Sequence, residues 1–258
     1  MQDRTSLISG LGDPTTTDNG VAIADRIASS ISIGLLSVGE RLPTEIELAH
    51  QFGVAVATLR KALAVLRERE LVVTRRGRGG GTFVVRTPFP SPDEMRTVLA
   101  HTSIVELRDL RDEQVAVATA VARLAATRSW GESIERLTGI AENLLAANTP
   151  GARASADSRF HIELAVLAQS PRLMRAELRL QSEVTPLLWS GVVPGMSSTA
   201  AHVDHLAVID AIRANDPDRA AGAISEHIDR GAFQLIDAKI SMEATAGQTL
   251  GSDERRRA

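Results

Sequence analysis

The chain has 258 residues, 43% of them hydrophobic and 3% aromatic, and its formal net charge is −3 at pH 7. This length and hydrophobic content suit two packed domains, and the absence of cysteine excludes disulfides and thiolate metal sites. No stretch approaches about 18 uninterrupted apolar residues and no basic segment with an apolar core opens the chain, so we expect a cytoplasmic protein with no membrane partner.

The amino-terminal part of the chain predicts a short run of helices. Residues 1–18 lack hydrophobic periodicity, and we expect a disordered tail there. From about Val21, isoleucines recur every four residues and indicate a first helix. Thr44 and Glu47 form a capping box that starts a second helix, and Gly53 suits the left-handed residue that ends it.

A third helix and a hairpin follow directly. Leucines at the spacing of a buried stripe predict a helix over residues 55–70. The β-branched runs 71–74 and 82–85 are separated by an arginine- and glycine-rich turn and are read as a β-hairpin. Its tip carries Arg75, Arg76 and Arg78. A helix pair followed by a basic hairpin is the arrangement of a winged helix-turn-helix, whose partner is double-stranded DNA.

The distribution of charge agrees with this interpretation. Residues 1–86 contain 11 Lys and Arg against 9 Asp and Glu, whereas residues 87–258 contain 18 against 23. The amino-terminal third is therefore net basic in a chain that is net acidic. Because the local patch decides contact with DNA, a pI near 6.1 does not argue against it.

Residues 20–86 resemble the DNA-binding domain of the GntR family of bacterial transcription regulators. The matching pieces are LPTE at 42–45, Leu48 and Ala49, Gly53 and Val54, TLRKAL at 58–63, and GRGGGTFV at 77–84. The chain departs from the family at Ile46, where arginine is common, and at Ala55 and Val56, where Ser-Arg is common. The resemblance therefore implies DNA contact only from the remaining helix and wing residues, which are Thr58, Arg60, Lys61, Arg75, Arg76, Arg78 and Gly79.

Beyond the hairpin, the sequence predicts a proline-rich linker and then only helices. We expect a winged helix domain over 19–86, a linker over 87–93, an all-helical domain over 94–242 and a disordered tail over 243–258. Hydrophobic periodicity and stop signals place helices at about 92–100, 103–127, 132–147, 153–168, 172–189, 199–214 and 218–242. The predicted fold class is mainly α, with a three-helix winged helix and its hairpin before a six- or seven-helix bundle.

The helical domain contains one cluster of candidate metal ligands. Asp157 and His161 are four residues apart and share one helix face. His205 and His227 each lie 11 residues from Asp216, so in an antiparallel helix pair both lie about 16 Å from the turn. Three imidazoles and one carboxylate suit Zn, Ni, Mn or Fe. Spacing alone leaves hydrogen-bonded core histidines as an alternative. His202, one turn before His205, is a further candidate that either replaces it or orients a ligand.

Residues 94–242 resemble the FCD class of ligand-sensing domains, which form the carboxyl-terminal half of many GntR regulators. The matching pieces are ELRDLRD at 106–112, DSRFH at 157–161, SPRL at 170–173, DHLAVIDAI at 204–212 and AISEHI at 223–228. The resemblance implies that Asp157, His161, His205 and His227 bind a divalent metal ion. It also implies that Arg108 faces an effector, although a surface salt bridge to Asp112 explains that arginine nearly as well.

Together these features predict a homodimeric DNA-binding regulator of a roughly palindromic operator. A small carboxylate effector bound at the metal would control its affinity for DNA. One alternative is a regulator in which the metal ion itself is the effector. A second is a metal-dependent hydrolase, but no glutamate stands in a His-Glu-x-x-His arrangement, and we expect no enzymatic activity.

Overall fold

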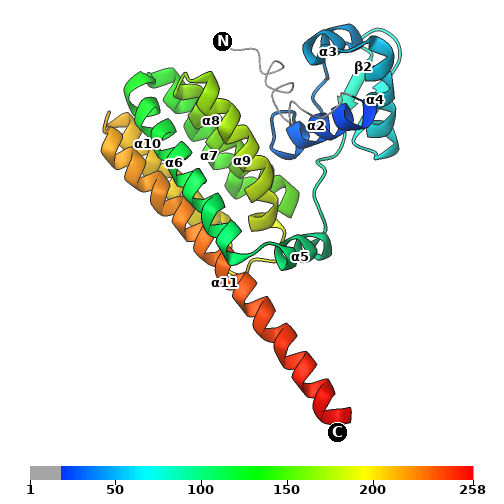
Figure 1. Cartoon of the computed structure of the whole chain (residues 1–258). Coiled ribbons are helices and arrows are strands. Elements are labelled where there is room, and N and C mark those ends of the chain that lie inside the picture. Colours follow the sequence, from blue (N-terminus) through cyan, green and yellow to red (C-terminus); the bar gives the residue numbers. More distant parts are fainter. Residues whose placement is uncertain (1–18, 258) are drawn as a thin grey trace.

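The computed structural model describes residues 19–257, and the tail predicted at residues 1–18 lies outside them. Side chains are described as far as Thr245. A small unit of three helices and a hairpin lies beside a bundle of longer helices (Figure 1). Helix α11 projects past the other helices of the bundle toward the carboxyl end (Figure 1).

Local signals define the three helices of the amino-terminal unit. Oδ1 of Asn19 caps the first helix by accepting from Val21 and Ala22. The predicted capping box is present, because the Thr44 and Glu47 side chains each accept from the other residue's backbone N–H. Gly53 ends that helix in the left-handed region, with φ of 66°. The three helices are α2 (Gly20–Ser32), α3 (Glu45–Phe52) and α4 (Val56–Glu68).

The wing is a two-stranded antiparallel hairpin. Strand β1 (Val72–Arg75) pairs with β2 (Gly81–Val84) from Val72 opposite Val84 to Arg75 opposite Gly81. The turn between them closes with a hydrogen bond from Gly80 N to Gly77 O. A Cβ at Gly80 would lie 2.5 Å from the Arg75 carbonyl oxygen, so this turn accepts no side chain there.

One apolar core joins these elements. It is formed by the inner faces of α2, α3 and α4 and by the inward ends of both strands. Its largest fully buried members are aliphatic, as expected for a chain with few aromatic residues. They include Ile23, Ile27, Ile31, Leu48, Leu59, Leu63 and Leu66.

The bundle begins after the proline-rich linker. Ser91 and Glu94 form a capping box at the first helix, and Ser103 and Glu106 form another at the second. The helices are α5 (Pro92–His101), α6 (Ile104–Arg128), α7 (Gly131–Ala146), α8 (Pro150–Leu167), α9 (Pro171–Trp189), α10 (Ser198–Arg213) and α11 (Pro217–Arg257). Helix α6 packs along α11, α8 along α9, and α10 lies against both α7 and α11.

The predicted fold class is confirmed, and two helix boundaries differ from the prediction by three residues or more. Helix α8 begins at Pro150 instead of residue 153, because Thr149 caps it and proline is well suited to a first helical position. Helix α11 continues to Arg257, past the expected end at 242. The apolar periodicity stops where the bundle stops, whereas no proline or turn signal interrupts the helix there.

Candidate metal centre and DNA-binding surface

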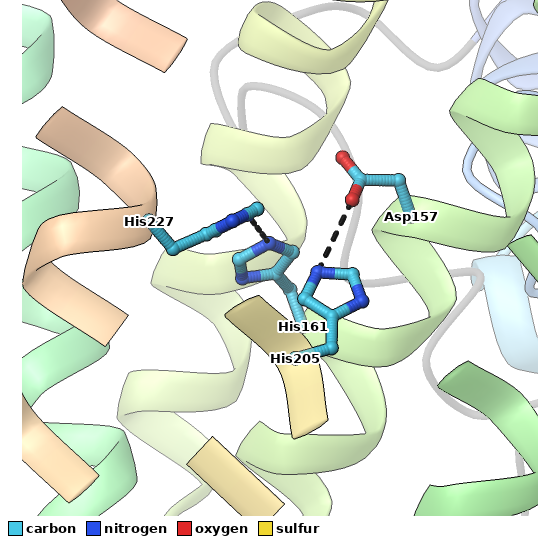
Figure 2. Close-up of side chains that lie close together, drawn as sticks. All are labelled: Asp157, His161, His205 and His227. Carbon is cyan, nitrogen blue, oxygen red and sulfur yellow. Dashed lines mark hydrogen bonds and ion pairs between the residues drawn. The ribbon is translucent and has the colours of Figure 1, made fainter. Parts of the chain in front are cut away.

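Four side chains from three helices of the bundle meet at one point (Figure 2). Asp157 and His161 lie one turn apart on α8, His205 lies on α10, and His227 lies on α11. One donor atom from each lies within 4.8 Å of the other three. The structure thus brings together all four residues that the sequence predicted as ligands.

Two pairs of donor atoms face each other at short distances. Nε2 of His161 lies 3.3 Å from Nε2 of His227, and Nε2 of His205 lies 3.3 Å from Oδ1 of Asp157. Metal–nitrogen bonds of about 2.0 to 2.1 Å at tetrahedral angles place ligand atoms about 3.3 Å apart. The spacing within each of these two pairs therefore fits a small divalent cation.

Several donor atoms in the cluster are buried without a hydrogen-bond partner among the described residues. They are Oδ1 of Asp157 and both ring nitrogens of His205, because the 3.3 Å contact between Oδ1 of Asp157 and Nε2 of His205 lacks hydrogen-bond geometry. Buried polar atoms in native proteins are nearly always satisfied, and an unsatisfied one costs about 1 to 3 kcal/mol. A metal ion that takes the lone pairs of Asp157 Oδ1 and one His205 nitrogen would remove most of this penalty.

Neighbouring side chains orient two of the four residues. Nε1 of Trp189 donates to Oδ2 of Asp157 at 3.0 Å, which leaves Oδ1 to face His205. Nδ1 of His227 lies 3.3 Å from Oδ2 of Asp204, and this directs the opposite ring nitrogen into the cluster. Such partners fix the ring orientation and tautomer of a metal-binding histidine.

The other two imidazoles are held by α9 and by an aromatic ring. Nδ1 of His161 lies 3.8 Å from Oε1 of Glu177, a buried carboxyl group on α9. The Phe160 ring stacks on His205 with ring centroids 3.7 Å apart. The sequence did not identify these supporting residues, because helix packing and not local spacing brings them to the cluster. They are Trp189, Asp204, Glu177 and Phe160.

Burial sets the protonation of the cluster. It lowers the pKa of His161 to about 3 and that of His205 to about 4, in both cases against the attraction of Asp157. Burial raises the pKa of Asp157, but interactions with the three histidines outweigh burial and lower that pKa overall. At neutral pH the cluster therefore contains a carboxylate and at least two neutral imidazoles, which are the forms that bind metal ions.

A cavity of about 50 Å³ lies beside the cluster, and residues of α6, α8, α9, α10 and α11 line it. Asp157, His161 and His227 line it. Its lining also contains two arginines that already have carboxylate partners. Arg111 Nε donates to Asp229 Oδ1 at 2.6 Å, and Arg230 donates to both carboxylate oxygens of Asp204 at 3.1 Å.

Two candidate residues from the sequence lie elsewhere. Arg108 is exposed and is not part of the cavity lining, which receives Arg111 from the next turn of α6 instead. The expected ion pair of Asp112 is made by Arg111 as well, at 2.8 Å. Nδ1 of His202 lies 3.1 Å from the Ala141 carbonyl oxygen on α7, so its ring is engaged outside the cluster.

The candidate DNA-binding surface is formed by α4 and the wing. On α4, Arg60 and Lys61 are exposed and Thr58 is half-buried. Nε of Arg60 donates to Oε2 of Glu45 on α3 at 2.8 Å, so this arginine is held between the two helices. Val56, one of the departures from the family pattern, is half-buried against the core.

The wing presents its arginines to solvent. Arg75, Arg76 and Arg78 are all exposed, as is Gly79 in the turn. The guanidinium group of Arg75 lies 5.0 Å from the centre of the Phe83 ring, which gives it a cation–π contact. A set of exposed guanidinium groups on a glycine-rich turn can approach a phosphate backbone closely.

Comparisons with known proteins identify both units. Residues 19–84 match the family described as bacterial regulatory proteins, gntR family, and residues 109–230 match the FCD domain. RmpR of Mycobacterium gastri, named as an HTH-type transcriptional regulator, is 51% identical over 85% of this chain and 81% of its own length. An L-lactate dehydrogenase operon regulatory protein of Escherichia coli K12 is 31% identical over 80% and 82%.

A solved structure shows the same fold. It is a transcriptional regulator of the GntR family from Pseudomonas syringae pv. tomato DC3000, with a TM-score of 0.50 and 19% identity over 94% of this chain and 96% of that one. Among the described residues, no helix has the length and apolar character needed to cross a membrane. With family matches over both units and a relative that is 51% identical over 85% of this chain, the chain belongs to the GntR family and is a bacterial transcriptional regulator, not an enzyme.

Proposed function

We propose that a small organic acid, bound beside a divalent metal ion in the bundle, controls the affinity of this regulator for its operator. The observation that carries the proposal is a buried donor set that opens into a cavity with cationic side chains. The residues proposed to hold the metal ion are Asp157, His161, His205 and His227.

Each part of the cavity has a role in this proposal. When bound, the metal ion would supply a Lewis-acidic docking point for a carboxylate. Arg111 and Arg230 would orient the polar end of the acid, and we assign them the role that the family resemblance had suggested for Arg108. The name of the E. coli relative refers to an operon for L-lactate dehydrogenase, whose substrate is a small hydroxy acid. That name supports the same chemical class for the effector here.

The amino-terminal unit would contact the operator. We propose that a homodimer places two α4 helices in successive major grooves of a roughly palindromic site, with the wings on the phosphates. Sedimentation of the protein with and without a duplex selected from a random library measures the number of chains per duplex. We expect two chains per duplex. The proposed contacts are Thr58, Arg60, Lys61, Arg75, Arg76, Arg78 and Gly79.

A thermal-shift panel of small carboxylic acids, run with and without a chelator, tests the effector proposal. An acid that binds only the folded, metal-loaded bundle at about 100 times its Kd stabilises it by about 2.7 kcal/mol. We expect stabilisation by at least one acid, loss of the effect on chelation, and loss of the effect in His161→Ala. The control variant His50→Ala, in an exposed position on α3, should respond like the wild type. Stabilisation that survives chelation would contradict a role for the metal.

The second candidate function is a regulator that responds to the metal ion alone. The complete burial of His205 favours it, because an ion enclosed by the protein could stabilise one conformation without any further ligand. DNA titrations with metal but no acid separate the two functions. A metal-dependent change in operator affinity that no acid modifies would establish the metal as the effector.

A further inference from the structure

The segment between α2 and α3 belongs to both units of the molecule. Ile33 and Leu35 are 1% and 5% exposed, and both pack into the core of the helical bundle. Leu36, the next residue, packs into the core of the winged helix unit. Residues 33–36 therefore join the two cores within a few residues of chain.

This segment rests directly on α8. Arg159 Nη1 donates to the carbonyl oxygen of Gly34 at 2.9 Å and to Oγ of Ser37 at 3.1 Å. Gly34 has φ of 74°, and a Cβ at this position would lie 2.5 Å from Oγ of Ser155 and 2.6 Å from Cγ of Arg159. Only a glycine permits the segment to approach α8 this closely.

Helix α8 presents its ligands of the cluster on one face and its contacts with residues 33–37 on the opposite face of the same turns. Asp157 and His161 point into the cluster (Figure 2). Ser155 and Arg159 are each offset by two residues from this pair, which is about 200° around a helix with 3.6 residues per turn. Because the interior is close-packed, a small tilt or rotation of α8 on metal binding would move both faces together.

We propose that Arg159 is a positioning residue that couples the cluster to the winged helix unit. In this proposal, ligand binding on the inner face of α8 changes the packing of Gly34 and Ser37 on its outer face. Since α2 ends at Ser32, directly before this segment, the packing of the segment sets how the DNA-binding unit is held on the bundle. The inference deepens the proposed function and rests on metal binding at Asp157 and His161.

Hydrogen–deuterium exchange of the full chain, with Zn²⁺ as the probe, tests the coupling without an identified acid or operator. In the wild type, Zn²⁺ should slow exchange of the backbone amides in 33–37 by at least about threefold, because a fixed α8 opens less often. In Arg159→Ala, these amides should exchange faster and should not respond to Zn²⁺. The variant should still bind as much Zn²⁺ per chain as the wild type.

Three further variants separate coupling from loss of structure. Arg159→Lys keeps one donor and should restore part of the response, and Ser37→Ala removes one acceptor and should reduce it partially. Arg175→Ala changes an exposed arginine on α9 and should behave as the wild type. Graded responses in chains with equal circular dichroism would assign the effect to these hydrogen bonds.

Two outcomes overturn the inference in different ways. If Zn²⁺ binds but exchange in 33–37 is unchanged in the wild type, or slows equally in Arg159→Ala, the coupling is wrong and the metal site stands. If Zn²⁺, Ni²⁺ and Mn²⁺ all fail to bind, the proposed function fails and the coupling fails with it. Metal stoichiometry, measured on the same samples, distinguishes the two.

Discussion

The two candidate sites of this regulator are built on opposite physical principles. The wing exposes Arg75, Arg76 and Arg78 to solvent, and their role requires only positive charge near phosphate. The cluster in the bundle buries its donors and orients them through neighbours such as Trp189 and Asp204. Long-range charge tolerates mobile side chains, whereas metal binding needs deprotonated ligands with correctly aimed lone pairs. Single substitutions in the cluster should therefore abolish metal binding, whereas substitutions in the wing should reduce DNA affinity gradually.

The largest expected effect is the loss of metal binding in Asp157→Asn. The amide has nearly the same shape but lacks the charge that the proposed ion requires, so we expect affinity to fall by more than about 100-fold. Metal content after dialysis against a competing chelator measures this loss. Asp210→Asn, in an exposed position on α10, is the matched control and should keep its metal. Equal metal content in both variants would contradict the assignment of Asp157.

Trp189→Phe tests whether orientation as well as identity matters in the cluster. Phenylalanine preserves most of the ring but removes the Nε1–H that holds Oδ2 of Asp157. We expect metal affinity to fall by about 10- to 100-fold, as for other partners that orient ligands. Competition titrations provide the measurement. The other tryptophan of the chain, Trp130, is 61% exposed, and Trp130→Phe should leave the affinity unchanged.

The wing should respond in a graded and salt-dependent way. Replacing both Arg76 and Arg78 with alanine removes two proposed phosphate contacts, so the slope of log affinity against log salt should become shallower by about 1.8. Affinity should fall to a similar extent for selected and unrelated duplexes, as fluorescence anisotropy at several salt concentrations would show. The control pair Arg172→Ala and Arg175→Ala changes two exposed arginines of the bundle. A slope equal to that of the control would remove the wing from the interface.

Acid should destabilise the metal-free bundle through its buried imidazoles. The pKa values of His161 and His205 are about 3 and 4 in the folded chain, below the ordinary 6.5, so their contribution to stability is complete above pH 6.5 and is lost as the pH falls. Burial raises the pKa of Glu177 to about 7, which acts in the opposite direction between pH 4.5 and 7. Two imidazoles against one carboxyl leave a net uptake of about one proton on unfolding, at most about 1.4 kcal/mol per pH unit.

Urea unfolding with chelator between pH 5 and 6.5 measures this balance. The wild type should lose stability toward pH 5, and Glu177→Gln should lose it about twice as steeply because the opposing carboxyl group is gone. Ser182→Ala, which changes a half-buried residue of the same helix, should follow the wild type. Parallel curves for the wild type and Glu177→Gln would mean that Glu177 is not the opposing group.

The same contrast explains which features could be predicted from the sequence. The capping box of Thr44 and Glu47 and the left-handed Gly53 depend on neighbours within a few residues, so they could be predicted from the sequence. Helical spacing also placed the histidines of α10 and α11 at one level. The supports from Trp189 and Glu177 depend on how α9 packs on α8, and no spacing along the chain encodes that packing. The packing of Ile33 and Leu35 into the bundle could not be predicted either, because an apolar residue fits either core.

The smallest expected effect concerns the start of α4. This helix lacks the side-chain N-cap that the neighbouring helix α3 has. Ala55 is the N-cap and makes no side-chain hydrogen bond there, whereas Thr44 caps α3. Ala55→Ser supplies a hydroxyl that can accept from the first turn, and should stabilise the amino-terminal unit by about 1 kcal/mol. Ala57→Ser, an exposed change just inside the same helix, offers no cap and should be neutral or slightly destabilising. Exchange rates of the amides in α4 provide the measurement, because capping should slow them while the metal affinity of the bundle stays constant. An equal effect of both serines would show that the start of α4 is set by packing against α2 and not by its cap.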